Sequence, residues 1–213
     1  MDISGEHIVL LGDSILDNKN YVGSDPDVLT HLKEMIPSGW KATLCAVDGE
    51  TTSGIKKQIK RVPANATHLF LSVGGNDALM NANLLYNQES IGIFLLRELA
   101  MVADAFRSSY LSAVNLLTAL RKPIYLFTIY NGNLEPDIEA AAKSAVAVFN
   151  DKIYSVANEL HLPVIELRRI CNQPEDYANP IEPSGIGGKK IAQAILNAIY
   201  RRQKYLNTRK GRL

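Results

Sequence analysis

Short apolar segments alternate with longer segments of helical periodicity along this chain. The apolar segments lie at residues 7–11, 42–47, 68–73, 124–128 and 163–167. They are apolar almost throughout, rather than at every second position, so they predict strands covered on both faces. That is the pattern of a parallel sheet.

The segments between the strands predict helices, because apolar residues recur in them every three to four positions or at multiples of that spacing. The positions that carry this repeat are Ile91, Leu95, Val102, Phe106, Ala113, Leu117 and Leu120, then Ile138, Ala142, Ala145, Phe149, Ile153, Val156 and Leu160, and finally Ile191, Ile195, Ala198 and Ile199. Strands that alternate with helices predict right-handed crossovers and a three-layer α/β/α sandwich around a five-stranded parallel sheet. Because the sequence contains no internal repeat and no linker segment, residues 1–213 are expected to form one domain.

Composition narrows the class of protein. Hydrophobic residues make up 46% and charged residues 21% of the chain, and the formal net charge is +1. These values are ordinary for a globular domain and give no reason to expect a nucleic-acid partner or an anionic membrane. Cys45 and Cys171 have no metal-type spacing, and only two cysteines fit a reduced compartment. No segment is long enough to cross a bilayer, and none resembles a signal peptide, so a cytoplasmic protein is expected.

The last residues are basic. Six basic residues and no acids follow position 200, namely Arg201, Arg202, Lys204, Arg209, Lys210 and Arg212. Such a run can contact phosphates, but the expectation is a flexible basic tail over residues 202–213.

Polar residues follow the ends of several predicted strands. The first strand runs into Gly12-Asp13-Ser14-Ile15, the second into Asp48-Gly49-Glu50, and the third into Gly74-Gly75-Asn76-Asp77. After the fifth, the loop at 171–183 ends in Asn179-Pro180-Ile181-Glu182-Pro183, just before the final helix. Sites in open α/β sheets form outside the carboxyl ends of the strands, so these residues are expected to meet.

Three of these blocks resemble the GDSL/SGNH hydrolase family. Gly12-Asp13-Ser14-Ile15 is similar to its G-D-S-L block and Gly75-Asn76-Asp77 to its G-x-N-D block. The segment that begins at Asn179 resembles the D-x-x-H-P-S block. The blocks occur in the family's order over nearly the whole chain. The resemblance implies a flavodoxin-like strand order and esterase or lipase chemistry without a metal or organic cofactor.

The resemblance also implies roles for individual residues. Ser14 is the expected nucleophile, and the backbone N–H groups of Ser14 and Gly49 with the Asn76 amide form the expected oxyanion hole. Physical reasoning agrees, since donors aimed at a developing oxyanion stabilise the transition state. Simpler interpretations stay open: Ser14 or Asn76-Asp77 as a helix N-cap, and Gly49 as a turn residue. Asp13 and Asp17 are expected to make structural hydrogen bonds.

The chain departs from the family at the base. Glu182 and Asn179 stand where the family has histidine and aspartate. Of the four histidines, His7, His68 and His161 each precede a predicted strand, which puts them at the opposite edge of the sheet, and His31 lies in a predicted helix whose side is not set by the sequence.

Glu182 is therefore the candidate base. A glutamate with its ordinary pKa near ~4.3 is a poor base at neutral pH, but burial can raise that pKa. A carboxylate becomes neutral when it takes a proton, so it needs no charged partner, and Asn179 is a chemically coherent supporting residue. The competing interpretation is that Glu182 is a surface acid near a helix start.

The sequence thus predicts hydrolysis of a small-molecule carboxylic ester through a Ser14 acyl-enzyme. The alternative is a catalytically impaired protein of the same fold that binds an acylated or glycosidic ligand or a protein partner. Residues 17–27 and 80–90 are expected to rim the pocket. Their apolar side chains favour a small or medium acyl group; these are Tyr21, Leu84, Leu85 and Tyr86. Cys171 is expected to be a packing or loop residue.

Overall fold

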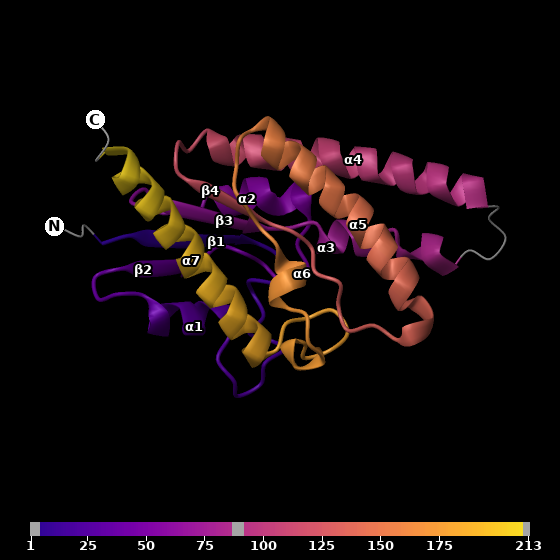
Figure 1. Cartoon of the computed structure of the whole chain (residues 1–213), viewed down its shortest axis with the longest axis horizontal. Helices are drawn as coiled ribbons and strands as arrows, with labels where there is room; N and C mark the ends of the chain where they lie inside the picture. Colours follow the sequence, from indigo (N-terminus) through magenta and orange to yellow (C-terminus); the bar gives the residue numbers. More distant parts are fainter. Residues whose placement is uncertain (1–4, 87–91, 211–213) are drawn as a thin grey trace.

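Five parallel strands form a single sheet in the order β2-β1-β3-β4-β5. This computed structural model describes residues 5–86 and 92–210. The strands are β1 (His7–Gly12), β2 (Lys41–Leu44), β3 (His68–Ser72), β4 (Ile124–Phe127) and β5 (Val164–Ile165). The expected parallel sheet and flavodoxin-like order are confirmed (Figure 1).

Helices cover both faces of the sheet. They are α1 (Val28–Met35), α2 (Ile55–Ile59), α3 (Gly75–Leu79), α4 (Gly92–Thr118), α5 (Pro136–Glu159), α6 (Leu167–Ile170) and α7 (Gly185–Lys210), with short 3-10 turns η1 (Thr52–Gly54), η2 (Ala82–Tyr86) and η3 (Pro174–Asp176). Within the described ranges, no helix is both long and apolar enough to cross a membrane.

Alternate residues of each strand bury into opposite layers. Val9 and Leu11 of β1 pack into one apolar cluster with residues of α2, α4 and α5. Ile8 and Leu10 pack into a second cluster with residues of α1 and α7. All four side chains are fully buried. Burial on both faces explains why the strands are apolar throughout, and it confirms the three-layer sandwich.

One expectation about local structure needs revision, and another stays untested. Ser14 does not begin a helix: it lies in a turn, and the first helix starts only at Val28. The N-cap interpretation of Ser14 is therefore wrong. The basic segment that starts at residue 202 continues α7 as helix up to Lys210. Its flexibility stays a prediction.

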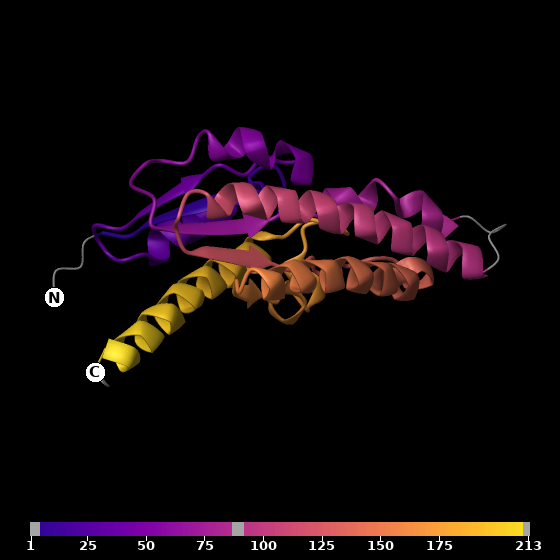
Figure 2. The same cartoon turned by 90° about the horizontal axis from the view of Figure 1, so that it is seen from above.

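The helices α4 and α5 lie side by side and extend past the carboxyl edge of the sheet (Figures 1 and 2). The first half of each helix therefore projects beyond the strands, next to the segment that carries α3 and η2. This arrangement gives the carboxyl edge a helical wall that a minimal doubly wound sheet lacks.

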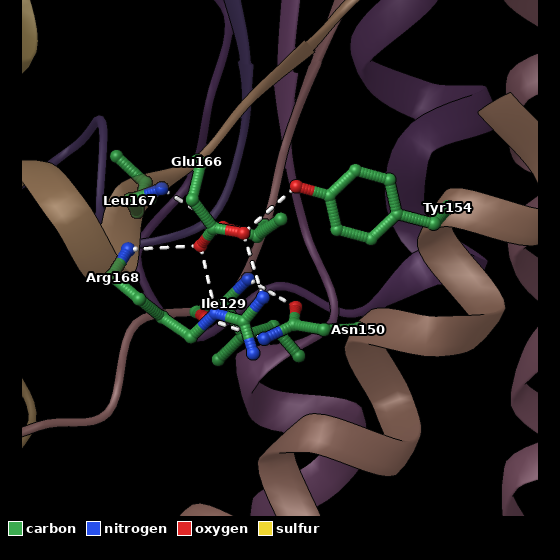
Figure 3. A network of polar contacts seen from close by, with 7 residues as sticks. Ile129, Asn150, Tyr154, Glu166, Leu167 and Arg168 are labelled. Atoms are coloured by element: carbon green, nitrogen blue, oxygen red, sulfur yellow. Dashed lines mark hydrogen bonds and ion pairs between the residues drawn. The ribbon is translucent and has the colours of Figure 1, made fainter.

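A polar network at the carboxyl ends of β4 and β5 ties these strands to α5 (Figure 3). The carboxylate of Glu166, just after β5, accepts hydrogen bonds from Thr128 Oγ1 and Tyr154 Oη at 2.8 Å and pairs with Arg168 at 2.7 Å. Burial alone would raise the pKa of Glu166, but the hydrogen bonds from Arg168, Tyr154 and Thr128 outweigh it and lower the pKa to about 2. The network therefore depends on an ionised carboxylate.

We predict that Glu166→Gln lowers the free energy of unfolding at pH 7 by on the order of 1 kcal/mol, since the pair with Arg168 is partly exposed. A carboxylate whose folded pKa lies below its unfolded value stabilises the protein above the unfolded pKa. That contribution is lost as the pH falls from about 4.5 toward about 2. Urea unfolding at pH 7 and pH 3 measures this contribution. The difference in free energy of unfolding between wild type and variant should be smaller at pH 3 than at pH 7. An equal difference at the two pH values contradicts the role of the ionised carboxylate.

Candidate active site

The turn that carries Ser14 follows directly from the end of β1. Gly12 has a φ of +126°, and a Cβ atom there would lie 1.6 Å from the carbonyl oxygen of Ser72 in β3. Only glycine allows this close approach between the strands. Beyond it, Asp13 N donates to Ser72 O at 2.9 Å, and Leu16 N closes the turn onto Asp13 O at 3.1 Å. Ser14 is therefore held at the carboxyl edge of the sheet.

Two buried amide side chains fix the backbone at the strand ends. Gln58 of α2 accepts from Gly12 N at 2.8 Å and donates to Gly12 O at 2.7 Å. Asn150 of α5 pairs in the same way with Ile129 N and O after β4, at 2.7 and 2.8 Å (Figure 3). Neither residue is among those predicted from the sequence. The sequence signal that could have identified them is a single amide side chain on the otherwise apolar face of a helix.

The structure brings Ser14 and Glu182 into direct contact. Ser14 Oγ donates a hydrogen bond to Glu182 Oε1 at 3.0 Å, although the residues are 168 positions apart in the chain. Each residue is only 6% exposed. The competing interpretation of Glu182 as a surface acid is therefore wrong.

Asn179 shapes the loop rather than contacting the Glu182 carboxylate. Its Oδ1 accepts from the backbone N–H groups of Ile181 and Glu182, both at 3.0 Å. Ala178 N in turn donates to Glu182 O at 2.9 Å. Asn179 thus forms an Asx turn that sets the backbone of Glu182.

Groups outside this loop hold its two ends. Tyr130, after β4, donates its hydroxyl to Ile181 O at 2.6 Å. Asn18, in the loop after β1, donates its side-chain amide to Pro183 O at 3.1 Å. These contacts flank Glu182 and leave its side chain directed to Ser14.

Asp176 anchors the start of the same loop to α7. It is fully buried, and its Oδ2 accepts from Asn172 N at 3.0 Å and Gln173 N at 3.1 Å. Its other carboxylate oxygen pairs with Lys190 Nζ at 2.6 Å, and its carbonyl accepts from Ser184 N at 2.9 Å. One side chain thus joins η3, the loop and the last helix.

The environment of Glu182 makes it a stronger base than an ordinary carboxylate. Burial raises the pKa of Glu182 to about 7, the hydrogen bond from Ser14 opposes the rise, and the negative charge of Asp48 adds to it. Among the described residues, no hydrogen bond reaches Glu182 Oε2. The carboxylate is therefore poised to gain a proton near neutral pH.

Asp13 and Asp17 make the structural hydrogen bonds expected of them. Asp13 Oδ1 accepts from Ile15 N at 3.2 Å, and Asp17 Oδ2 accepts from Asp48 N at 3.1 Å. Burial raises the pKa of Asp13 well above its usual value, even though the Ile15 N–H opposes the rise, and the charge of Glu182 raises it further. A second buried carboxyl group with a raised pKa thus adjoins the site.

The oxyanion-hole role expected of Ser14, Gly49 and Asn76 stays a prediction, and of the three residues Ser14 and Asn76 line the pocket at this site. Asn76 Nδ2 donates one hydrogen bond to Glu50 O at 2.9 Å, which joins the third strand-end block to the second. Gly49 sits in that second block with a φ of +76°. No hydrogen bond among the described residues engages the backbone N–H of Ser14 or Gly49.

The alternative of an N-cap at Asn76-Asp77 is wrong. The N-cap of α3 is Gly74, and both residues lie inside the helix. Asp77 instead accepts from Thr52 N at 3.1 Å and from Thr52 Oγ1 at 2.6 Å. It therefore braces the loop after β2 against α3.

Within the described residues, no histidine makes a hydrogen bond to Ser14 or Glu182. His7 and His68 begin β1 and β3, at the amino edge. His161 lies in the turn before β5. His31 lies in α1, and its Nε2 is 3.0 Å from Gly185 O.

Burial raises the pKa of the Cys171 thiol to about 12, which keeps it protonated at neutral pH.

A pocket with a cavity volume of about 140 Å³ opens beside Ser14, Asn76 and Glu182. Leu84 lines it, as expected, but no residue from 17–27 does. Tyr21 instead donates its hydroxyl to Asp48 at 2.9 Å. The side chains of residues 85 and 86 lie outside the described part of the chain.

Solved structures of other proteins share this fold. An extracellular lipase from Streptomyces rimosus aligns over 91% of this chain and 100% of its own, with a TM-score of 0.69 and 15% identity. Phospholipase A1 from Streptomyces albidoflavus aligns over 91% and 99%, with a TM-score of 0.69 and 13% identity. The acetyl xylan esterase AlAXEase aligns over 91% and 99%, with a TM-score of 0.67 and 16% identity. No curated protein matches the chain.

The sheet order and the strand-end blocks define a doubly wound hydrolase fold of the SGNH type. The chain belongs to the GDSL-like lipase/acylhydrolase family, whose model matches residues 10–186. The cytoplasmic location expected from the sequence stays a prediction.

We predict that Asp176→Ala lowers the free energy of unfolding by about 2–4 kcal/mol, because it leaves two backbone N–H groups and the Lys190 ammonium without their partner. Urea denaturation measures the loss. The neighbouring exposed acid provides the matched control: Glu175→Ala should change stability by less than about 0.5 kcal/mol. Equal losses in the two variants contradict the anchoring role of Asp176.

We also predict that Glu182→Gln stabilises the protein at high pH. A glutamate whose folded pKa of about 7 lies above its unfolded value favours folding below the unfolded pKa, and that contribution is lost as the pH rises through 7. The free energy of unfolding of the variant should exceed that of wild type by on the order of 2 kcal/mol at pH 8.5, and the two values should be similar at pH 4.5. Denaturant unfolding at both pH values tests this, and a variant less stable than wild type at pH 8.5 contradicts it.

Proposed function

We propose that this protein hydrolyses carboxylic esters through a Ser14 acyl-enzyme, with Glu182 as the general base. The observation that carries the proposal is the 3.0 Å hydrogen bond from Ser14 Oγ to Glu182 Oε1 inside a buried site. A base within this distance of a hydroxyl is placed to take its proton.

Acylation follows from this contact. Ser14 Oγ attacks the ester carbonyl carbon while its proton passes to Glu182, and the carbonyl oxygen becomes an oxyanion. The N–H groups of Ser14 and Gly49 and the Asn76 amide are the proposed donors to it. As the tetrahedral intermediate collapses, the carbon–oxygen bond to the leaving alcohol breaks, and Glu182 returns its proton to that alcohol.

Deacylation repeats these steps with water. Glu182 removes a proton from water as it attacks the acyl carbon, and the proton then passes to Ser14 Oγ as the acid product leaves. Glu182 is neutral whenever it holds the proton, so no charged group is needed to stabilise it. A base of pKa about 7 suits both proton transfers at neutral pH.

The second candidate function is ligand or partner binding without turnover. The departure of the Asn179 and Glu182 positions from the family's aspartate and histidine favours it. It predicts that substitution of Ser14 leaves any ester hydrolysis unchanged.

We predict that kcat/KM for a short-chain p-nitrophenyl ester rises with pH through an apparent pKa of about 7, since only ionised Glu182 accepts the serine proton. Ser14→Ala and Glu182→Gln should each lower kcat/KM at pH 8 by at least about 100-fold. Glu175→Gln, at an exposed position of the same loop, is the control and should retain wild-type values. Equal rates in all four proteins rule out the proposed mechanism.

The double variant Asn179→Asp/Glu182→His restores the family's block and separates the two candidates. The new aspartate would keep the acceptor oxygen on which the turn depends, and a histidine is a good base at pH 7. If the donors around Ser14 are intact, kcat at pH 7 should rise by about tenfold or more over wild type. A double variant that folds, as judged by circular dichroism, but hydrolyses no ester favours the binding function.

A further inference from the structure

The pocket beside Ser14 continues away from the sheet along α5. The α5 residues that line it are Ala142, Ala145, Val146 and Phe149, which stand at positions i, i+3, i+4 and i+7 of the helix. Residues with this spacing form one stripe along a helix. The pocket therefore follows α5 for about two turns.

The clamp on Asn150 gives the direction of this extension. Asn150 is fixed to Ile129 at the end of β4, so its place along α5 is level with the carboxyl edge of the sheet. At 1.5 Å per residue, Ala145 lies about 7 Å and Ala142 about 12 Å farther from the sheet. Side chains shrink along this path, from Phe149 through Val146 to the two alanines.

The walls of the extension are apolar. Across from α5 stand Ala78 of α3, Leu84 of η2 and Leu99 of α4. The polar residues that line the pocket as a whole are Asp13, Ser14, Asn76, Asn81, Tyr130, Asn131 and Glu182. Asn81 already donates its amide to Asp77 O at 2.9 Å. A pocket that follows a helix for two turns, yet encloses about 140 Å³, is narrow.

We propose that this extension holds the unbranched aliphatic acyl chain of the ester, and that Ala142 and Ala145 set the longest chain it accepts. The inference rests on the proposed function of Ser14. With the carbonyl at Ser14, the chain lies against Phe149 first, then against Val146, and against Ala142 last. The methyl side chains of the two alanines leave the space that a longer chain needs, and larger residues there fill it.

The test compares p-nitrophenyl esters with straight acyl chains of increasing length. Each CH₂ buried in the pocket should raise kcat/KM by about fourfold until the chain outgrows the pocket. Ala145→Leu and Ala142→Leu should each lower kcat/KM at least tenfold for the longest chains that wild type accepts. The longest acyl chain that is still hydrolysed should be shorter in Ala145→Leu than in Ala142→Leu. Both should leave the acetate ester within about twofold.

Matched controls come from the exposed face of the same helix. Ala141 and Ala147 are exposed, so Ala141→Leu and Ala147→Leu should show the wild-type chain-length profile. Val146→Ala, which enlarges the pocket, should shift the optimum to longer chains. This opposite shift keeps the proposal testable if a leucine variant does not fold. A profile that is the same in all these variants overturns the proposal.

Binding of a ligand that cannot be hydrolysed separates this inference from the proposed function. Straight-chain methyl ketones carry a carbonyl and an alkyl chain without a leaving group. By isothermal titration, their affinity for wild type should rise with chain length and show the same limits in Ala142→Leu and Ala145→Leu. If the ketones behave so while no ester is hydrolysed, the pocket assignment stands and the hydrolase proposal fails. If hydrolysis depends on Ser14 but the substitutions of Ala142 and Ala145 do not change its chain-length profile, the hydrolase proposal stands and the pocket assignment fails.

Discussion

The site depends on one hydrogen bond, from the Ser14 hydroxyl to the Glu182 carboxylate, made where water has little access. In water, a carboxylate gives its proton up near pH ~4 and is a weak base at pH 7. Burial changes this because the charged form loses its hydration, while the hydrogen bond from Ser14 replaces only part of it. The same contact therefore orients the Ser14 hydroxyl within a setting that raises the pKa of the Glu182 carboxyl group.

The Glu182 carboxylate is buried, and its Oε2 atom accepts no hydrogen bond from the described residues. This lowers the stability of the fold, and contacts around the loop compensate for the loss. Asn179 fixes the backbone of the Glu182 loop, Asp176 ties its start to α7, and Tyr130 holds it from β4. At the carboxyl ends of β4 and β5, the carboxylate of Glu166 is satisfied by three neighbouring side chains. The charge near Ser14 is thus left under-solvated, whereas the carboxylate of Glu166 is well bonded.

Much of the fold could be predicted from the sequence, because strands buried on both faces are apolar throughout and each begins within one residue of its expected position. The strand-end rule and the resemblance also placed Ser14, Asn76 and Glu182 around one pocket. The turn at Ser14 could not be predicted, since nothing local distinguishes a turn and a long loop from an immediate helix there. Gln58 and Asn150 were missed because their partners, Gly12 and Ile129, are backbone groups far away in the chain. The extension along α5 depends on how far two helices project beyond the sheet, which periodicity does not encode.

The most direct measurement is the rate at which a fluorophosphonate labels Ser14, followed against pH in wild type and in Glu182→Gln. Labelling requires the serine to lose its proton but requires no substrate pocket and no deacylation. If Glu182 is the base, the wild-type rate rises with pH around a midpoint of about 7, and the variant labels at least about 100-fold more slowly at pH 8. If the two proteins give the same rate and the same pH profile, the carboxylate does not activate Ser14, and the central claim is contradicted.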